Sequence, residues 1–203
     1  MNDRKVFLIR HTEPLLPDNK KKFIGQTDVL LSHDGIEHAY RLGETLRQEN
    51  VKSIYTSPLR RAFQTAKIIG DLHGLTPIII PELTEIYLGN WEDRSFEEIQ
   101  KDFPEEFEER GKNLVGYRVP GGESFEDLYR RGRKMLQGIL SSSEGNLIMV
   151  GHKGMNRELL CAILKIPLQQ LMSIPQNYGC INILGERNRT LEVLKINTDK
   201  ACP

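Results

Sequence analysis

Short aliphatic runs alternate with longer amphipathic segments along the chain, a pattern that predicts strands separated by helices. The short runs are rich in β-branched and aliphatic residues and are bounded by turn-forming residues, which is typical of strands. We expect strands at residues 5–9, 51–56, 77–80, 146–150, 180–184 and 190–196. The last two runs flank a polar turn, so they predict a hairpin at a sheet edge.

The longer segments carry apolar residues at spacings of three and four, as amphipathic helices do. Most of them begin at a residue that can cap a helix. The predicted helices run from Ser32 or Asp34 to Asn50, from Ser57 to near Gly74, from Ser95 to Arg110, from Ser124 to Leu140 and from Met155 to Leu164. Ser95 and Glu98 also match a capping box.

Residues 88–122 break this alternation, because they contain an acidic helix and a glycine-rich loop with no strand between them. We interpret them as an insertion packed over the strand ends, in which Trp91 anchors its loop by burial. This insertion could be a functional lid or a plain connecting segment, and the sequence does not separate the two interpretations. The whole chain, residues 1–203, otherwise suits one domain.

Composition narrows the range of partners. The chain has 28 lysines and arginines against 28 aspartates and glutamates, so no global charge recruits nucleic acid or an anionic membrane. Any attraction for anions must therefore be local. No apolar run approaches the roughly 18 residues of a membrane span, and the chain leads directly into a strand instead of a secretory signal. Cys161, Cys180 and Cys202 lack metal-type spacing and predict reduced thiols in a cytoplasmic protein.

Charged side chains recur where the predicted strands end. The first strand runs into Arg10 and His11, the second leads into a helix with Arg60 in its first turn, and the fourth ends at His152. A lone histidine at a strand end is more often satisfied by hydrogen bonds than catalytic. Charged side chains at the ends of three strands, however, point to one ligand site. Adjacent helical residues do not share a face, so we expect Arg61 to lie on the surface.

A carboxylate also follows the third strand, where Glu82 and Glu85 compete for a role that local physics cannot assign. Two arginines near helix N-termini favour a doubly charged oxyanion such as a phosphoryl group. A neutral imidazole is a competent nucleophile, a protonated His152 would stabilise the transferred group, and a glutamic acid would protonate the leaving alcohol. The sequence contains no metal-binding motif, so we expect no cofactor.

Several motifs together resemble the histidine phosphatase superfamily, in its phosphoglycerate-mutase-like branch. They are Leu8-Ile9-Arg10-His11-Thr12-Glu13, Ser57-Pro58-Leu59-Arg60-Arg61-Ala62, Glu85-Ile86-Tyr87-Leu88-Gly89-Asn90-Trp91-Glu92 and Gly151-His152-Lys153-Gly154. The resemblance spans residues 5–196. It implies an α/β fold, a three-layer α/β/α sandwich whose mostly parallel central sheet has an antiparallel edge strand and a helical insertion over the C-terminal strand ends.

The same resemblance implies roles for individual residues. His11 would be the phosphorylated nucleophile, Arg10, Arg60 and His152 would bind phosphate, and Glu85 instead of Glu82 would be the proton donor. Further substrate contacts are implied at Ile24, Gly25 and Lys153, which stand where relatives contact substrate. One departure is Thr12, which replaces the glycine usual in the family and crowds the close approach of the backbone to phosphate. We still expect activity.

Loops at residues 23–28, 122–125 and 178–182 look most like those of α-ribazole-phosphate phosphatases. The leading hypothesis is therefore a metal-independent phosphomonoester hydrolase, with α-ribazole 5'-phosphate as the candidate substrate. The alternatives are a phosphoglycerate mutase, a broad-specificity sugar or acid phosphate phosphatase, and a scaffold protein with a decayed site. We expect a small phosphate ester as partner, no nucleic acid or membrane, and a homodimer through the closing hairpin. Lys20, Lys21 and Lys22 form either a solvated loop or a patch that meets the anionic substrate.

Overall fold

The central sheet of the computed structural model has six strands. They are β1 (Arg4–Arg10), β2 (Val51–Thr56), β3 (Ile78–Ile79), β4 (Asn146–Gly151), β5 (Ile181–Arg187) and β6 (Thr190–Thr198). The structure describes residues 4–16, 22–188 and 190–200. The strand order is β3-β2-β4-β1-β5-β6, with β1 to β4 parallel. The antiparallel strand is β5, which lies one position in from the edge, because β6 pairs with its outer side.

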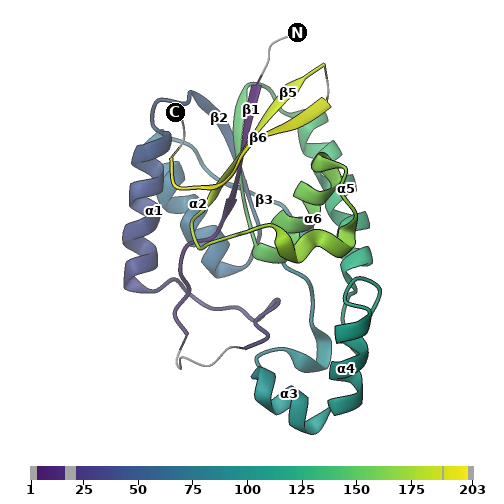
Figure 1. Cartoon of the computed structure of the whole chain (residues 1–203). Helices are drawn as coiled ribbons and strands as arrows, with labels where there is room; N and C mark the ends of the chain where they lie inside the picture. The colour runs from purple at the N-terminus through teal and green to yellow at the C-terminus, as the bar shows by residue number, and fades with distance from the viewer. Residues whose placement is uncertain (1–3, 17–21, 189, 201–203) are drawn as a thin grey trace.

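Helices cover both faces of this sheet and confirm the predicted three-layer fold. One face carries α1 (His33–Leu46) and α2 (Arg60–His73), and the other carries α5 (Phe125–Ser142) and α6 (Lys153–Leu164) (Figure 1). Ser32 caps α1 and Ser124 caps α5 through hydrogen bonds from the first-turn backbone. The 3-10 turns η1 (Pro81–Leu83), η2 (Gly89–Trp91) and η3 (Leu168–Ser173) lie in the connections.

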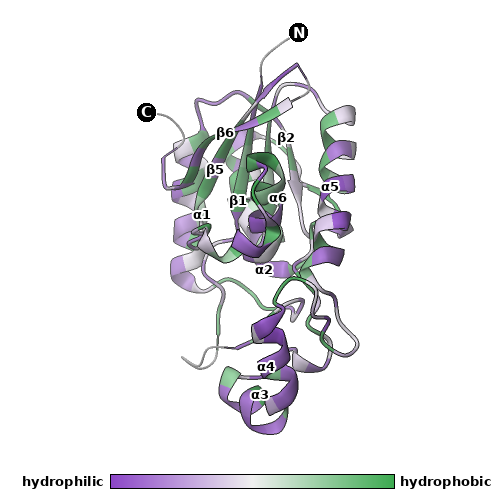
Figure 2. Ribbon diagram, turned by 45° about the vertical axis from the view of Figure 1, so that its right-hand side comes forward, coloured by the Kyte–Doolittle hydropathy of each residue, from purple (hydrophilic) through white to green (hydrophobic). Residues whose placement is uncertain are grey.

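The core is divided by the sheet into two clusters, and β1 contributes to both. Successive side chains of a strand point to opposite faces. Val6 and Leu8 accordingly join the cluster under α5 and α6, whereas Phe7 and Ile9 join the cluster under α1 and α2. Figure 2 shows the hydrophobic residues concentrated on the strands and on the helix sides next to them. The sheet is thus buried on both faces, which fixes the positions of its strand ends.

The insertion forms two helices, α3 (Phe96–Asp102) and α4 (Pro104–Lys112), beyond the carboxyl ends of β1 and β4 (Figure 1). The prediction of one continuous helix was wrong at Phe103, because a residue before proline avoids the helical conformation. The capping box of Ser95 and Glu98 is confirmed, as is the burial of Trp91, which is 1% exposed. Phe23 stacks on Phe96 at a ring distance of 4.1 Å and ties the insertion to the loop after β1.

Four smaller expectations remain, of which two can be compared with the structure. In the part of the chain that it describes, no helix is long and apolar enough to cross a membrane. Cys161 and Cys180 are free and buried, whereas Cys202 lies outside the described residues. Lys20 and Lys21 also lie outside them. Pairing of two chains through the β5–β6 hairpin stays a prediction.

Candidate active site

Two histidines meet at the carboxyl ends of β1 and β4. These neighbouring strands run parallel and pair Arg10 with Gly151, so the residues that follow, His11 and His152, leave the sheet side by side. Their ring centroids lie 5.2 Å apart. His11 is 5% exposed and His152 is fully buried. The structure therefore brings together the two histidines that the sequence placed at separate strand ends.

The hydrogen bonds of His11 determine which ring nitrogen is free to react. Its Nδ1 lies 2.7 Å from the carbonyl oxygen of Thr12. A carbonyl oxygen can only accept, so Nδ1 must carry the hydrogen. In the neutral ring this leaves the lone pair on Nε2, which lies 3.3 Å from Nε of Arg61. The ring nitrogen that carries the lone pair thus faces a guanidinium group.

The structure reverses the predicted placement of Arg60 and Arg61. Arg61 is 2% exposed and donates to the carbonyl oxygens of Thr27 and Gly25 as well as to His11. Arg60 is exposed. The prediction was wrong because α2 turns Arg61 and Thr65, one helical turn apart, toward the end of β1. Arg61 and not Arg60 is therefore the arginine beside the two histidines.

Arg10 supplies the second cation of the site. Its guanidinium carbon lies 3.7 Å from the centre of the Tyr178 ring, and Nη1 donates to the carbonyl oxygen of Gln176 at 2.7 Å. Nε of Arg10 is buried without a hydrogen-bond partner among the described residues. The Tyr178 ring also lies 5.6 Å from that of His11. A guanidinium fixed in this way still has a donor available for an anion.

Burial and nearby cations keep both histidines neutral. The pKa of His11 is lowered well below 6.5, first by burial and then by the charges of Arg61 and Arg10. The pKa of His152 is also lowered well below 6.5, first by burial and then by Arg61, His11 and Arg10. In the ligand-free site His152 is therefore neutral, and its protonation in the presence of a phosphoryl group stays a prediction. Its Nε2 pairs with Oγ of Ser57 at 2.8 Å, while Nδ1 has no partner within the described parts of the chain.

Glu85 is the carboxylate that reaches this site, and Glu82 is exposed. The Glu85 side chain accepts hydrogen bonds from the backbone N–H of Gly154 at 2.8 Å and of Met155 at 3.2 Å. Since His152 makes no side-chain cap of α6, Glu85 satisfies the free N–H groups at the start of that helix. This anchors the carboxyl group at the N–H groups two and three residues beyond His152. The structure thus separates two glutamates that local sequence physics left equivalent.

The loop after β1 lies against Arg61. The Arg61 guanidinium donates from Nη2 to the carbonyl oxygen of Gly25 at 2.6 Å and from Nη1 to that of Thr27 at 2.7 Å. Gly25 has a φ of +36°, and a Cβ there would lie 2.0 Å from Oε1 of Glu92. Glu92 in turn accepts from the backbone N–H groups of Gln26 and Thr27. Gly25 is therefore required by the packing of this loop, whatever its contact with substrate.

Three further predicted positions border the site. Ile24 is half-buried in the same loop, and Lys153 is exposed at the first residue of α6. Thr12 is fully buried, and its backbone N–H and its hydroxyl group both lie 3.2 Å from Oγ1 of Thr65. The threonine side chain therefore packs against α2, where a glycine would leave this contact unmade.

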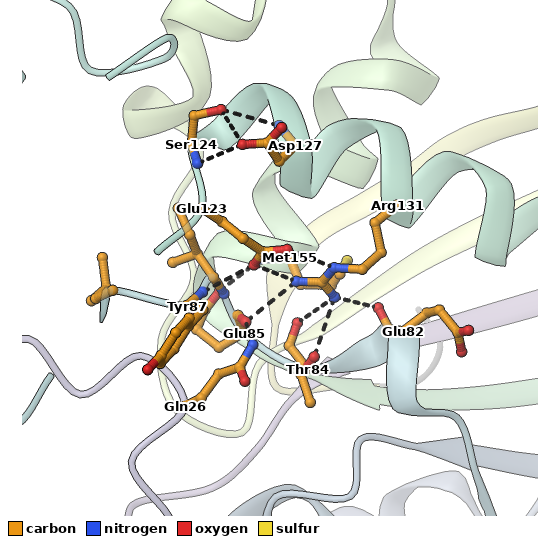
Figure 3. A network of polar contacts seen from close by, with 12 residues as sticks. Gln26, Glu82, Thr84, Glu85, Tyr87, Glu123, Ser124, Asp127, Arg131 and Met155 are labelled. Atoms are coloured by element: carbon orange, nitrogen blue, oxygen red, sulfur yellow. Dashed lines mark hydrogen bonds and ion pairs between the residues drawn. The ribbon is translucent and has the colours of Figure 1, made fainter. Parts of the chain in front are cut away.

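Sequence reasoning missed the polar residues that support the site from outside it. Ser57, predicted as a helix cap, pairs with His152, while Oδ1 of Asp28 accepts from the first N–H of α2. The cluster of cations at residues 130–134 predicts a solvated helix face, but Arg131 binds Glu123 and the backbone carbonyl groups of Glu82 and Thr84 (Figure 3). Ser124 marks where α5 begins, but it does not indicate that Arg131 and Glu123 meet the Glu85 segment.

Comparison with known proteins agrees with this geometry. The profile of the family described as histidine phosphatase superfamily (branch 1) matches residues 6–199. The chain belongs to this superfamily. Within the described residues, no group of three or more histidine, cysteine, aspartate or glutamate side chains is placed to hold a metal ion. The predicted membership, fold class and phosphatase class are confirmed.

Individual members of the histidine phosphatase superfamily show how far the likeness extends. The chain is 33% identical over 190 residues to mouse 6-phosphofructo-2-kinase/fructose-2,6-bisphosphatase 1, covering 87% of this chain and 38% of that protein. The chain thus spans well under half the length of this relative. YhfR of Bacillus stearothermophilus has a TM-score of 0.86 and 30% identity over 98% of both chains. The α-ribazole phosphatase of Shigella flexneri has a TM-score of 0.89 at 23% identity, again over 98% of each, and supports the fold alone.

Proposed function

We propose that this protein is a phosphomonoester hydrolase that works through a phosphohistidine at His11. The observation that carries the proposal is the orientation of the His11 ring, whose Nδ1 donates to Thr12 while Nε2 faces Arg61. A neutral imidazole with its lone pair beside a cation is arranged to attack an electron-poor phosphorus. Arg10 and Arg61 would bind the equatorial oxygens of the transferred group.

In the first half of the reaction, Nε2 of His11 attacks phosphorus and the bond from phosphorus to the ester oxygen breaks. Glu85, in its carboxylic acid form, gives its proton to the departing alcohol. In the second half, the Glu85 carboxylate takes a proton from water, the resulting hydroxide attacks phosphorus, and the bond to Nε2 breaks. Inorganic phosphate leaves and both side chains return to their starting states.

His152 would donate a hydrogen bond from Nδ1 toward the phosphoryl group. Its Nε2 is paired with Ser57, and Nδ1 is the buried nitrogen that lacks a partner within the described residues. A bound dianion would oppose the effect of Arg61 and Arg10 and favour protonation of this ring. The change in charge would then accompany substrate binding instead of preceding it.

The non-phosphate half of the substrate would lie between the loop containing Ile24 and the start of α6, with Lys153 at the border. Residues 88–122 would act as a lid, because their aromatic residues pack on Phe23 next to this loop. The similarity of the loops to ribazole phosphatases makes α-ribazole 5'-phosphate the substrate that we propose. The mutase and the broad-specificity phosphatase remain the alternatives.

Trapping the intermediate tests the reaction. Protein incubated with a phosphate ester labelled in its phosphoryl group and then quenched should carry an acid-labile, base-stable label. The label should be lost in His11→Ala and retained in His33→Ala, which removes an exposed histidine. Full turnover by His11→Ala would disprove the phosphohistidine mechanism. Activity that chelators abolish would contradict metal independence.

A panel of esters tests the substrate. We expect the highest kcat/KM for α-ribazole 5'-phosphate, compared with phosphoserine, sugar phosphates and phosphoglycerates. Similar values across the panel would favour the broad-specificity phosphatase. Isomerisation of phosphoglycerate that depends on a bisphosphate primer would favour the mutase. Failure to hydrolyse any ester, including 4-nitrophenyl phosphate, would favour a binding protein.

A further inference from the structure

Arg131 and Glu123 form an ion pair next to the segment that carries Glu85. Arg131 lies two turns into α5, and Glu123 immediately precedes the Ser124 cap of that helix. Nε of Arg131 lies 3.1 Å from one carboxylate oxygen of Glu123, and Nη2 lies 2.8 Å from the other. The side chains are 19% and 23% exposed. Such a two-point pair fixes the plane of the guanidinium group.

The donors that remain on Arg131 are directed at the backbone before Glu85. Nη1 donates to the carbonyl oxygen of Glu82 at 2.6 Å and to that of Thr84 at 3.0 Å. Nη2 lies 3.4 Å from the carbonyl oxygen of Glu85 itself. Figure 3 shows these contacts converging on one guanidinium group. One side chain thus contacts three carbonyl groups within four residues.

Glu123 holds the same segment on the other side of Glu85. Its Oε2 accepts from the N–H of Tyr87 at 3.0 Å, and its own N–H donates to the carbonyl oxygen of Tyr87 at 2.8 Å. Gln26 adds a further bond, from Nε2 to the carbonyl oxygen of Glu85 at 2.9 Å. The backbone on both sides of Glu85 is therefore bound to the start of α5.

This support matters because the segment has little regular structure of its own. Between η1 and η2, residues 84–88 belong to no helix or strand. The contacts just described hold the carbonyl groups of Thr84 and Glu85 and both backbone groups of Tyr87. A proton donor must stay within hydrogen-bond reach of the leaving oxygen, and small displacements are costly. A loop without secondary structure needs external contacts to meet that requirement.

We propose that the Arg131–Glu123 pair positions Glu85 for proton transfer. This inference rests on the proposed function, because it assigns the pair a role in the step that Glu85 performs. Neither residue touches the reacting atoms, so both are positioning residues. If the pair acts on the reaction through Glu85, its loss should be largest for substrates whose leaving group needs a proton from an acid.

The leaving group distinguishes this role from a general structural one. An alkyl phosphate releases a basic alkoxide that must be protonated, whereas 4-nitrophenyl phosphate releases a stable phenolate that leaves without help. We expect Arg131→Gln to lower kcat/KM by about 10- to 100-fold for the alkyl ester and by less than about threefold for the nitrophenyl ester. Equal losses on both esters, or no loss on either, would overturn the proposal.

Two further variants keep the test decisive if Arg131→Gln folds poorly. Glu123→Gln turns one acceptor into a donor that faces Arg131 and Tyr87, so it should show the same dependence on leaving group. Arg131→Lys keeps the charge but cannot make the forked contact, and we expect a smaller loss of the same kind. Arg133→Gln is the matched control, since Arg133 is exposed on the same helix and contacts Tyr129. It should leave both kcat/KM values within about twofold.

A double mutant shows whether Arg131 acts through Glu85. In a Glu85→Gln background, Arg131→Gln should cause no further loss on the alkyl ester, because effects of residues that act as a unit do not add. A second full loss would overturn the proposal. The phosphohistidine label is measured separately. If wild-type protein carries no label on His11, the proposed function fails. If wild-type protein is labelled but Arg131→Gln loses the same kcat/KM on both esters, only the role of the pair is refuted.

Discussion

Glu158 is buried on α6 in a way that should make the stability of the protein depend on pH. Its side chain is fully buried, and neither carboxyl oxygen has a hydrogen-bond partner among the described residues. It faces Gly132 of α5, where a Cβ would lie 1.7 Å from Oε1, so the two helices close over the carboxyl group. Burial raises the pKa of Glu158 from 4.5 to about 9, while the charges of Arg131 and Arg133 lower it in part.

Whether stability rises or falls with pH depends on how many protons the folded and the unfolded protein each bind. Between pH 4.5 and about pH 9 the folded protein keeps the Glu158 proton, whereas the unfolded chain releases it. The unfolded state therefore binds fewer protons, and the free energy of unfolding falls as pH rises through this window. The loss is about 1.4 kcal/mol for each pH unit, or roughly 3 kcal/mol at neutral pH relative to a side chain that stays neutral.

Glu158→Gln removes the titration while nearly preserving shape. We expect the difference in unfolding free energy between Glu158→Gln and wild type to grow by about 3 kcal/mol in favour of the variant between about pH 5.5 and about pH 7.5. Urea denaturation at both pH values measures it. Glu144→Gln, which changes an exposed glutamate, should shift stability by less than about 0.5 kcal/mol at either pH. A Glu158→Gln difference that does not change with pH would show that the folded protein does not hold the proton.

Three other predictions concern the site itself. Arg61→Gln should lower kcat/KM by about 100-fold, whereas Arg60→Gln should change it by less than about threefold; the opposite ranking in a steady-state assay would restore the sequence-based choice. His11 should stay neutral down to well below pH 6.5, so that the nucleophile persists as pH falls; a titration of the imidazole by NMR, assigned with His11→Ala, would contradict this if protonation occurred at or above 6.5. Gly25→Ala should cost about 1–3 kcal/mol of stability in urea denaturation, because it combines a positive φ with a clash. Gly111→Ala, where no atom lies within 4 Å of the added Cβ, is its control and should be neutral or slightly stabilising.

The sequence predicts the strand ends of this fold well and the helix faces less well. A buried parallel strand is a continuous aliphatic run, so His11 and His152 can be placed at strand ends from the pattern alone. The choice between Arg60 and Arg61 depends instead on how α2 is rotated about its axis, because neighbouring side chains of a helix point about 100° apart. The small side chains Ala62 and Ala66 mark the side of α2 that faces the sheet, and Arg61 borders it.

The polar contacts around Glu85 could not be predicted for a different reason. Arg131 is one of four cations within five residues of α5, a composition typical of an exposed face. Its ion pair with Glu123 forms only because the insertion returns the chain to the start of α5 next to the Glu85 segment. No local pattern encodes that meeting. The role of Glu158 is hidden in the same way, since its burial depends on how closely α5 approaches α6.

The neutral charge of the two histidines connects these observations with the proposed reaction. Arg10 and Arg61 donate to backbone carbonyl oxygens, and no carboxylate among the described residues forms an ion pair with either. Glu85 opposes both charges from beyond ion-pair distance, as Asp28 and Glu92 do for Arg61, whereas Glu123 pairs directly with Arg131. Burial, followed by the charges of Arg61 and Arg10, lowers the pKa of His11 and keeps the proposed nucleophile free of a proton. The same two charges would attract a dianionic phosphoryl group. In a chain with no net charge, the preference for phosphate that we propose would thus arise from two arginines that form no ion pair with a carboxylate among the described residues.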